Sequence, residues 1–148
     1  MEEPLTAQPI RFDTTAVPQF EAATRSREQS NFLVFPRPAP TQAMVVPIAY
    51  LEPLTSANRL AIGYDMYSEP VRRESMDSAI RRGQPVASGK VLLIQDEDAE
   101  GTSGFLIYMP VFRSENGGRV VAGFVYSPFR ADEFVASAAE LFHNRQVE

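Results

Sequence analysis

Runs of apolar and β-branched residues alternate with polar, proline-bearing stretches along this chain, and they predict a set of short β-strands. A run from Phe32 to Phe35 ends at the proline-rich segment 36–40, which lacks donors for a β-ladder. Five further runs, each bounded by turn-forming residues, are residues 45–50, 60–64, 91–94, 104–112 and 119–126.

The last two runs have the pattern of a β-hairpin. Asn116 and Gly117 lie between them, and this pair favours a type I′ turn, whose two central residues need positive φ. Apolar residues occupy both alternating faces of the run 104–112, so we expect that strand to be covered on both sides. Pro110 removes one ladder donor, which predicts a bulge or an unpaired edge.

Three segments carry helical signals. Residues 16–29 place apolar side chains on one narrow stripe behind Thr15, which can cap the helix. Ser68 and the proline two residues later predict the start of a second helix that ends at Gly83, and a third helix begins at Ala131. This order of elements, with a tight hairpin near the end, predicts an α+β fold with an antiparallel sheet covered by helices.

A set of short motifs also runs through the chain in a characteristic order. The motifs are Tyr50-Leu-Glu-Pro-Leu, Asn58-Arg, Gly63-Tyr-Asp-Met, Ser68-Glu-Pro-Val-Arg-Arg, Ala79, Gly83, Gly104-Phe-Leu-Ile-Tyr-Met-Pro-Val, Gly123-Phe-Val-Tyr and Phe129-Arg. As an ordered set over roughly residues 12–135, they resemble the CHASE domain. CHASE is the extracytoplasmic sensor module of bacterial histidine kinases, diguanylate cyclases and plant cytokinin receptors.

The resemblance implies an α+β, PAS-like fold: a five-stranded antiparallel sheet flanked by helices and curved around a small ligand pocket, with an additional N-terminal helix and strand. Residues 13–148 would form the sensor domain, and residues 1–12 an N-terminal tail or a remnant of cloning that includes Met1. The family also implies a periplasmic or extracellular part of an inner-membrane protein. The flanking transmembrane helices and the helical stalk would then lie outside this segment.

Composition and charge narrow the classes of function. The 148 residues are 44% hydrophobic and 10% aromatic, as expected for one globular domain. A net charge of −5 argues against a nucleic-acid-binding protein. The absence of cysteine excludes disulfides, thiolate nucleophiles and cysteine-based zinc sites. No apolar run approaches the length of a membrane span, and the start of the chain carries no basic and apolar signal.

Catalytic motifs are absent from the sequence. An enzyme would have to depend on His143, the single histidine, which lies in a polar tail. No GxGxxG, P-loop or HExxH pattern occurs, so we expect no catalytic residue, metal or cofactor. The acidic run 96–100 could offer oxygens to calcium, but its spacing is not that of an EF-hand and favours a solvated loop. The arginines at 72–73 and 81–82 could form a basic face for an anion or lipid headgroups, although such side chains more often remain in water or pair locally, here with Glu69, Glu74 and Asp77.

Polar residues in or beside the apolar runs are the candidate ligand-binding residues, because small-molecule sites combine apolar walls with a few polar groups. The family usually has threonine at the position of Ser88, so a hydroxyl is kept there. Each candidate also has a structural interpretation, since aspartate bonds backbone amides, Glu-Pro ends strands and tyrosines pack in cores. The candidates are Tyr50, Glu52, Tyr64, Asp65, Ser88, Lys90 and Tyr108.

These observations favour a non-catalytic sensory input domain. It would bind a small molecule outside the membrane and bias a histidine kinase or diguanylate cyclase domain of a homodimeric receptor. One alternative is a ligand-free structural or dimerisation module, whose pocket would be collapsed and filled by Tyr64, Phe105 and Tyr108. Another is a small stand-alone enzyme with a polar cleft around His143.

Overall fold

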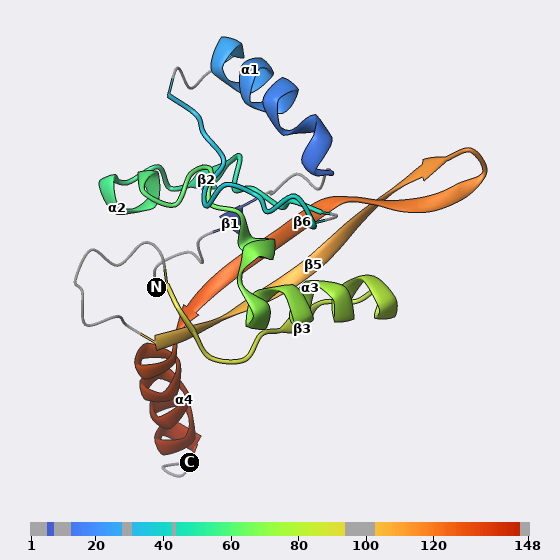
Figure 1. The fold of residues 1–148 in the computed structure, drawn as a ribbon. Coiled ribbons are helices and arrows are strands. Elements are labelled where there is room, and N and C mark those ends of the chain that lie inside the picture. The colour runs from blue at the N-terminus through green and yellow to red at the C-terminus, as the bar shows by residue number, and fades with distance from the viewer. Residues whose placement is uncertain (1–5, 8–12, 28–30, 43, 94–102, 146–148) are drawn as a thin grey trace.

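A long antiparallel hairpin forms the centre of the molecule. The computed structural model of the chain describes residues 6–7, 13–27, 31–42, 44–93 and 103–145. The hairpin consists of two thirteen-residue strands, β5 (Ser103–Glu115) and β6 (Gly118–Arg130). Its tip extends beyond the other elements, and its opposite end continues into the C-terminal helix α4, Ala131–Arg145 (Figure 1).

Four two-residue strands complete a six-stranded antiparallel sheet around the hairpin. β1 pairs with β6 and β2, while β3 and β4 both pair with β5. The α+β class with an antiparallel sheet is therefore confirmed, although the described residues form six paired segments where five strands were expected. The short strands are β1 Thr6–Ala7, β2 Leu51–Glu52, β3 Val86–Ala87 and β4 Val91–Leu92.

The turn and the irregularity of the hairpin lie where the sequence predicts them. Asn116 and Gly117 have φ angles of 50° and 78°, both positive as a type I′ turn requires. The β5–β6 register shifts between Val111 and Phe112, next to Pro110. The local sequence therefore accounts for the reversal, whereas the break leaves one extra residue on β6, between Val121 and Gly123, just beyond the paired Pro110.

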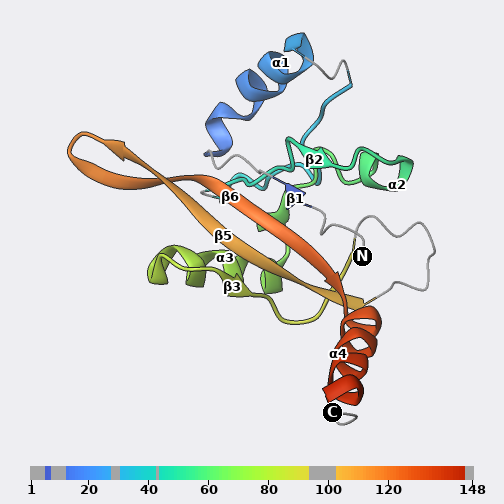
Figure 2. The same cartoon turned by 180° about the vertical axis from the view of Figure 1, so that it is seen from behind.

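The expectation that β5 is covered on both faces is wrong. Leu106 and Tyr108 are buried on one face, whereas Met109 and Val111 on the other are 51% and 41% exposed. Figures 1 and 2 show helix α3 (Pro70–Arg82) running alongside the ribbon. The opposite face of β5 is covered only at the end near α4. There the Phe105 ring stacks on the Phe129 ring of β6, with 5.1 Å between the ring centres.

The predicted helices form, with differences in their caps. Helix α1 (Val17–Arg27) follows a 3₁₀ turn, η1 (Thr14–Ala16), whose N-cap is Asp13 and not Thr15. Helix α3 begins at Pro70 and ends at Gly83, whose φ of 62° gives the left-handed C-cap. Its N-cap is Glu69, while the Ser68 hydroxyl donates to the Asp65 carbonyl.

Three of the expected strands are replaced by other backbone. The run 60–64 contains turns that follow a short helix, α2 (Ser56–Arg59), and the run 32–35 contributes one bridge, between Phe35 and Tyr64. The run 45–50 likewise forms a bridge at Pro47 in place of a strand. These segments are apolar because they are buried beside one another, and their amides and carbonyls bond irregularly across them, as in Ile48 N to Tyr64 O.

The buried side chains form a main core and a smaller one. The main core lies between the hairpin, α3 and the segment before β2, and it contains Tyr108, Phe124 and Met76. The smaller one lies under α1 and includes Val17 and Phe32. Its members are Val17, Phe32, Val34 and Val45.

Candidate ligand-binding site

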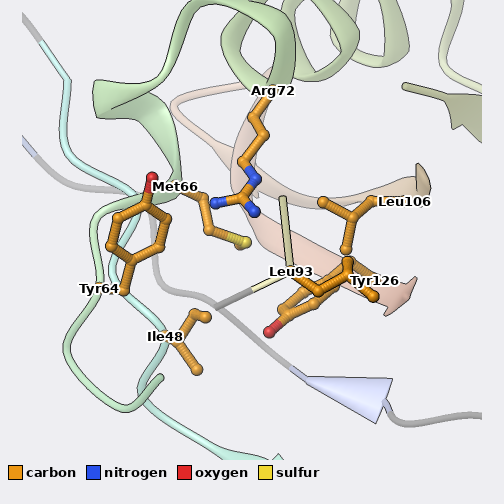
Figure 3. Close-up of a pocket in the computed structure, with 7 residues that line it drawn as sticks. All are labelled: Ile48, Tyr64, Met66, Arg72, Leu93, Leu106 and Tyr126. Carbon is orange, nitrogen blue, oxygen red and sulfur yellow. The ribbon is translucent and has the colours of Figure 1, made fainter. Parts of the chain in front are cut away.

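A small cavity lies inside the main core, between α3 and the hairpin. It offers about 10 Å³ to the centres of water-sized molecules, which is roughly the room that one water needs. In Figure 3, Arg72 reaches from α3 towards Met66, with Tyr64 on one side and Leu106 and Tyr126 on the other. The cavity is lined by Ile48, Tyr64, Met66, Arg72, Leu93, Leu106 and Tyr126. Met66 belongs to the 3₁₀ turn η2, Met66–Ser68.

Arg72 supplies a buried positive charge to this cavity. Its side chain is only 3% exposed, because it lies on the inner face of α3. One guanidinium nitrogen, Nη2, donates to the Leu92 carbonyl at 2.7 Å, and the guanidinium carbon lies 5.0 Å from the centre of the Tyr64 ring. Nε is buried and has no hydrogen-bond partner among the described residues. A donor of this strong cation therefore remains open inside the core.

Two carboxylates near Arg72 along the chain, those of Glu69 and Asp65, are used elsewhere. Glu69 caps α3 by accepting from the amides of Val71 and Arg72 at 3.0 and 2.9 Å. Asp65 is fully buried and accepts from the Val46 and Tyr67 amides. Within the described residues, no carboxylate lies within ion-pair distance of the Arg72 guanidinium. A buried charge without an ionic partner is costly, so its presence points to a use.

Two tyrosine hydroxyls lie in the same region. The Tyr126 hydroxyl is buried and has no hydrogen-bond partner in the described part of the chain. The Tyr108 hydroxyl lies 3.6 Å from the Met66 sulfur, and its ring lies 5.9 Å from that of Tyr126. Burial raises the pKa of both phenols, and the nearby Arg72 charge only partly opposes this. Both groups are therefore neutral O–H donors over the physiological pH range.

The structure brings three of the predicted site residues together. Tyr64 lines the cavity, and Tyr108 packs directly behind its wall. Asp65 is adjacent in the chain, but its oxygens are engaged by two backbone amides and by Gln42 Nε2 at 2.6 Å. Burial is the main cause that raises the pKa of Asp65, and these hydrogen bonds oppose it. Asp65 thus holds the backbone around the cavity.

The other four predicted residues do not line the cavity. Tyr50 is 49% exposed, and its hydroxyl donates to the exposed Glu52 carboxylate at 2.8 Å. The Ser88 hydroxyl accepts from the Leu106 amide and donates to a neighbouring carbonyl, so it ties the loop after β3 to the hairpin. Lys90 is exposed.

The predicted ligand-binding residues include neither Arg72 nor Tyr126, and Arg72 is considered from the sequence only as part of a possible basic face for an anion. An arginine on such a helix is expected to be solvated or paired with a nearby carboxylate, yet Arg72 shares the stripe of buried residues at positions i, i+3, i+4 and i+7 of α3. That spacing places it on the core side of the helix. Of the alternatives weighed for other residues, the enzyme site would depend on His143, which is exposed, and the acidic run 96–100 lies outside the described residues. No group of three potential metal ligands occurs in the described ranges.

The family model of the CHASE domain matches residues 10–148. No curated protein matches the chain. None of the helices within the described ranges has the length and apolar character needed to cross a membrane.

Proposed function

The chain belongs to the CHASE domain family of sensory domains of signalling receptors, and we propose that it detects a small molecule outside the membrane. Ligand binding would shift the population of two arrangements of the domain and so bias a histidine kinase or diguanylate cyclase domain of the same receptor. The segment itself is non-catalytic in this proposal. It lies on the periplasmic or extracellular side of an inner membrane, between transmembrane helices.

The observation that carries the proposal is the pair of open donors at the cavity. Arg72 Nε and the Tyr126 hydroxyl are both buried and unpartnered among the described residues, although buried polar groups in folded proteins nearly always have a partner. Apolar walls with a few converging polar groups are typical of small-molecule sites. We therefore place the ligand at this cavity, with Tyr64 and Tyr108 as neighbouring site residues and Asp65 as a positioning residue.

A ligand-free structural module is the second candidate, and the small volume of the cavity favours it. This candidate predicts a cavity filled by three aromatic rings, and the structure shows only part of that arrangement. Tyr64 and Tyr108 lie at the cavity, whereas Phe105 lies on the other face of β5 and packs against rings of β6 and α4. A structural module would bind no ligand at this cavity, so a binding experiment distinguishes the two candidates.

The first test is a thermal-shift screen of the purified chain against purines, amino acids, organic acids and divalent cations. A ligand at one hundred times its Kd stabilises the native state by about 2.7 kcal/mol, which raises the Tm of a domain of this size by several degrees. We expect Tyr64→Ala to abolish the shift. Tyr50→Ala is the matched control, because it removes an exposed tyrosine away from the cavity.

Two results would count against the proposal. A broad panel without any shift favours the structural module. A shift that Tyr50→Ala removes and Tyr64→Ala leaves intact places the ligand elsewhere on the domain. The sensory role itself is tested in a full receptor carrying this chain as its input domain, where ligand should change the kinase or cyclase rate.

We also propose that the receptor is a homodimer that uses α4. Aromatic and aliphatic side chains on this helix are 52% to 71% exposed. Their spacing follows the helical repeat of a packing stripe. These side chains are Phe134, Val135, Leu141 and Phe142.

A further inference from the structure

We propose that the cavity binds the carboxylate group of a small organic acid, with Arg72 as the cation and Tyr126 as a second donor. The inference rests on the proposed sensory function, because it names the ligand class of that same site. It is drawn from the charge, the open donors and the apolar walls around them.

The charge of the site selects for an anion. Arg72 is 3% exposed, has no carboxylate within ion-pair distance in the described part of the chain, and leaves Nε open. The guanidinium is a planar fork of donors that matches the two oxygens of a carboxylate. An anion bound at the Nε edge would neutralise the buried charge and satisfy the open donor together. A cation would meet repulsion there, and a neutral ligand would leave the charge unpaired.

Tyr126 adds a directional donor from the opposite wall. Its hydroxyl is buried without a partner among the residues that the structure describes, and the ring lines the cavity from β6 (Figure 3). Because burial raises its pKa, the phenol keeps its proton and donates. Two donors of this kind, one charged and one neutral, are complementary to an oxyanion and give charge-assisted hydrogen bonds.

The remaining walls limit the rest of the ligand. Ile48, Leu93 and Leu106 are apolar, so the part beyond the carboxylate must be small and aliphatic. The free volume of about 10 Å³ accommodates little more than one water, so entry requires a wall to move. Met66 is suited to this, because its unbranched thioether side chain adapts to irregular spaces.

Anion binding also offers a route from the site to the sheet. Arg72 Nη2 holds the Leu92 carbonyl of β4 at 2.7 Å, and β4 pairs with β5 through Val91 and Leu92. A carboxylate that draws the guanidinium towards the cavity would weaken this link between α3 and β4. The bound and free states would then differ at the edge of the hairpin.

The test is isothermal titration calorimetry of the purified chain, in carboxylate-free buffer, with acetate and propionate and with acetamide and propionamide as neutral analogues of the same shape. We expect the acids to bind at least tenfold more tightly than the amides. Arg72→Met should weaken acid binding by about tenfold to a hundredfold, the range for losing a hydrogen bond to a charged group. Tyr126→Phe should weaken it by about tenfold or somewhat more, because its hydrogen bond to the carboxylate is also charge-assisted.

Two control measurements show whether a loss of binding comes from the site itself or from a change in the fold. Arg82→Met removes an exposed arginine from the same helix and should leave acid binding unchanged. Tyr126→Phe should also leave the Tm of the ligand-free chain within about a degree, because the lost hydroxyl has no partner in the described ranges of the chain. Equal affinity for acids and amides, no binding in the series, or undiminished acid binding by a folded Arg72→Met variant would each overturn the inference.

The inference and the sensory proposal fail in different ways. If neutral compounds bind at the cavity and change receptor output, the ligand class is wrong and the sensory proposal stands. If acids bind through Arg72 but leave the output of a receptor carrying the chain unchanged, the site assignment stands and the sensory proposal fails.

Discussion

Asp65 shows how one buried carboxylate organises the backbone next to the cavity. One of its oxygens, Oδ1, accepts from the Val46 and Tyr67 amides, and Oδ2 accepts from Gln42. These bonds connect the segment 42–46 to the segment 65–67. The side chain therefore has a structural use whether or not a ligand binds nearby.

Asp65→Ala should lower the free energy of unfolding by about 1–3 kcal/mol for each buried donor left without an acceptor. Asp65→Asn should cost less, because its carbonyl oxygen can still accept from the Val46 and Tyr67 amides. Urea denaturation of the two variants checks the order. Equal losses would show that the Gln42 contact, the one that Asn cannot keep unaltered, dominates.

The protonation of Asp65 should also make the free energy of unfolding depend on pH. Burial raises the pKa of Asp65 above its ordinary value, so the native state holds the proton more tightly than the unfolded state. This contribution is fully present below the unfolded pKa of about 3.9 and is lost as pH rises through the native pKa. The wild type should therefore lose stability relative to Asp65→Asn as pH rises above about 4. A wild-type gain over that window would show a lowered pKa.

Sequence reasoning located the neighbourhood of the candidate site but not its two open donors. Tyr64 and Tyr108 can be predicted as site residues, because a tyrosine within an apolar run is apparent from the sequence alone. Arg72 is one of four arginines in a charged helix, and only its spacing with the buried Ser75, Met76 and Ala79 distinguishes it. The isolation of the Tyr126 hydroxyl depends on which side chains face it across the core, and a single sequence does not contain that information.

Among the elements, the predictable ones have a strong local signal. Pro70 and Gly83 bound α3, and the Asn116-Gly117 pair reverses the hairpin, because each needs only its own backbone preference. The runs 32–35 and 60–64 do not form the predicted strands. An apolar run indicates that a segment is buried, but it does not show whether a neighbouring strand is there to pair with it. Their irregular pairing depends on a close approach of two backbones at Gly63.

Gly63→Ala should be far more damaging than Gly117→Ala. Both glycines have positive φ, 89° and 78°, but a Cβ at Gly63 would lie 2.0 Å from the Leu33 carbonyl oxygen, while one at Gly117 would meet nothing within 4 Å. We expect Gly117→Ala to cost about 1–2 kcal/mol from φ alone. Gly63→Ala should cost about 3 kcal/mol or more, as other backbone-incompatible substitutions do. Thermal denaturation of both variants measures the difference, and equal losses would show that the Leu33 segment moves aside freely.

At the scale of the molecule, the proposed dimer makes α4 the surface to test. Leu141 is 69% exposed on this helix, so Leu141→Glu should leave the fold intact and weaken self-association by placing charge in the interface. Leu60→Glu is the matched control, because Leu60 is 50% exposed far from α4 in the sequence. Sedimentation velocity across a concentration series gives the measurement. Unchanged association of the Leu141 variant would exclude this face of α4.

The junction between β6 and α4 fixes the rotational phase of the last helix. β6 ends at Arg130 and α4 begins at Ala131, so no linker residue separates strand from helix. Each residue inserted at this point would turn every face of α4 by about 100°. An insertion of seven residues would nearly restore the original orientation, within about 20°. In chimeric receptors built on this domain, the output should therefore vary periodically with the number of residues inserted at this junction, with the period of the α-helix. It should not change steadily with the length of the insertion.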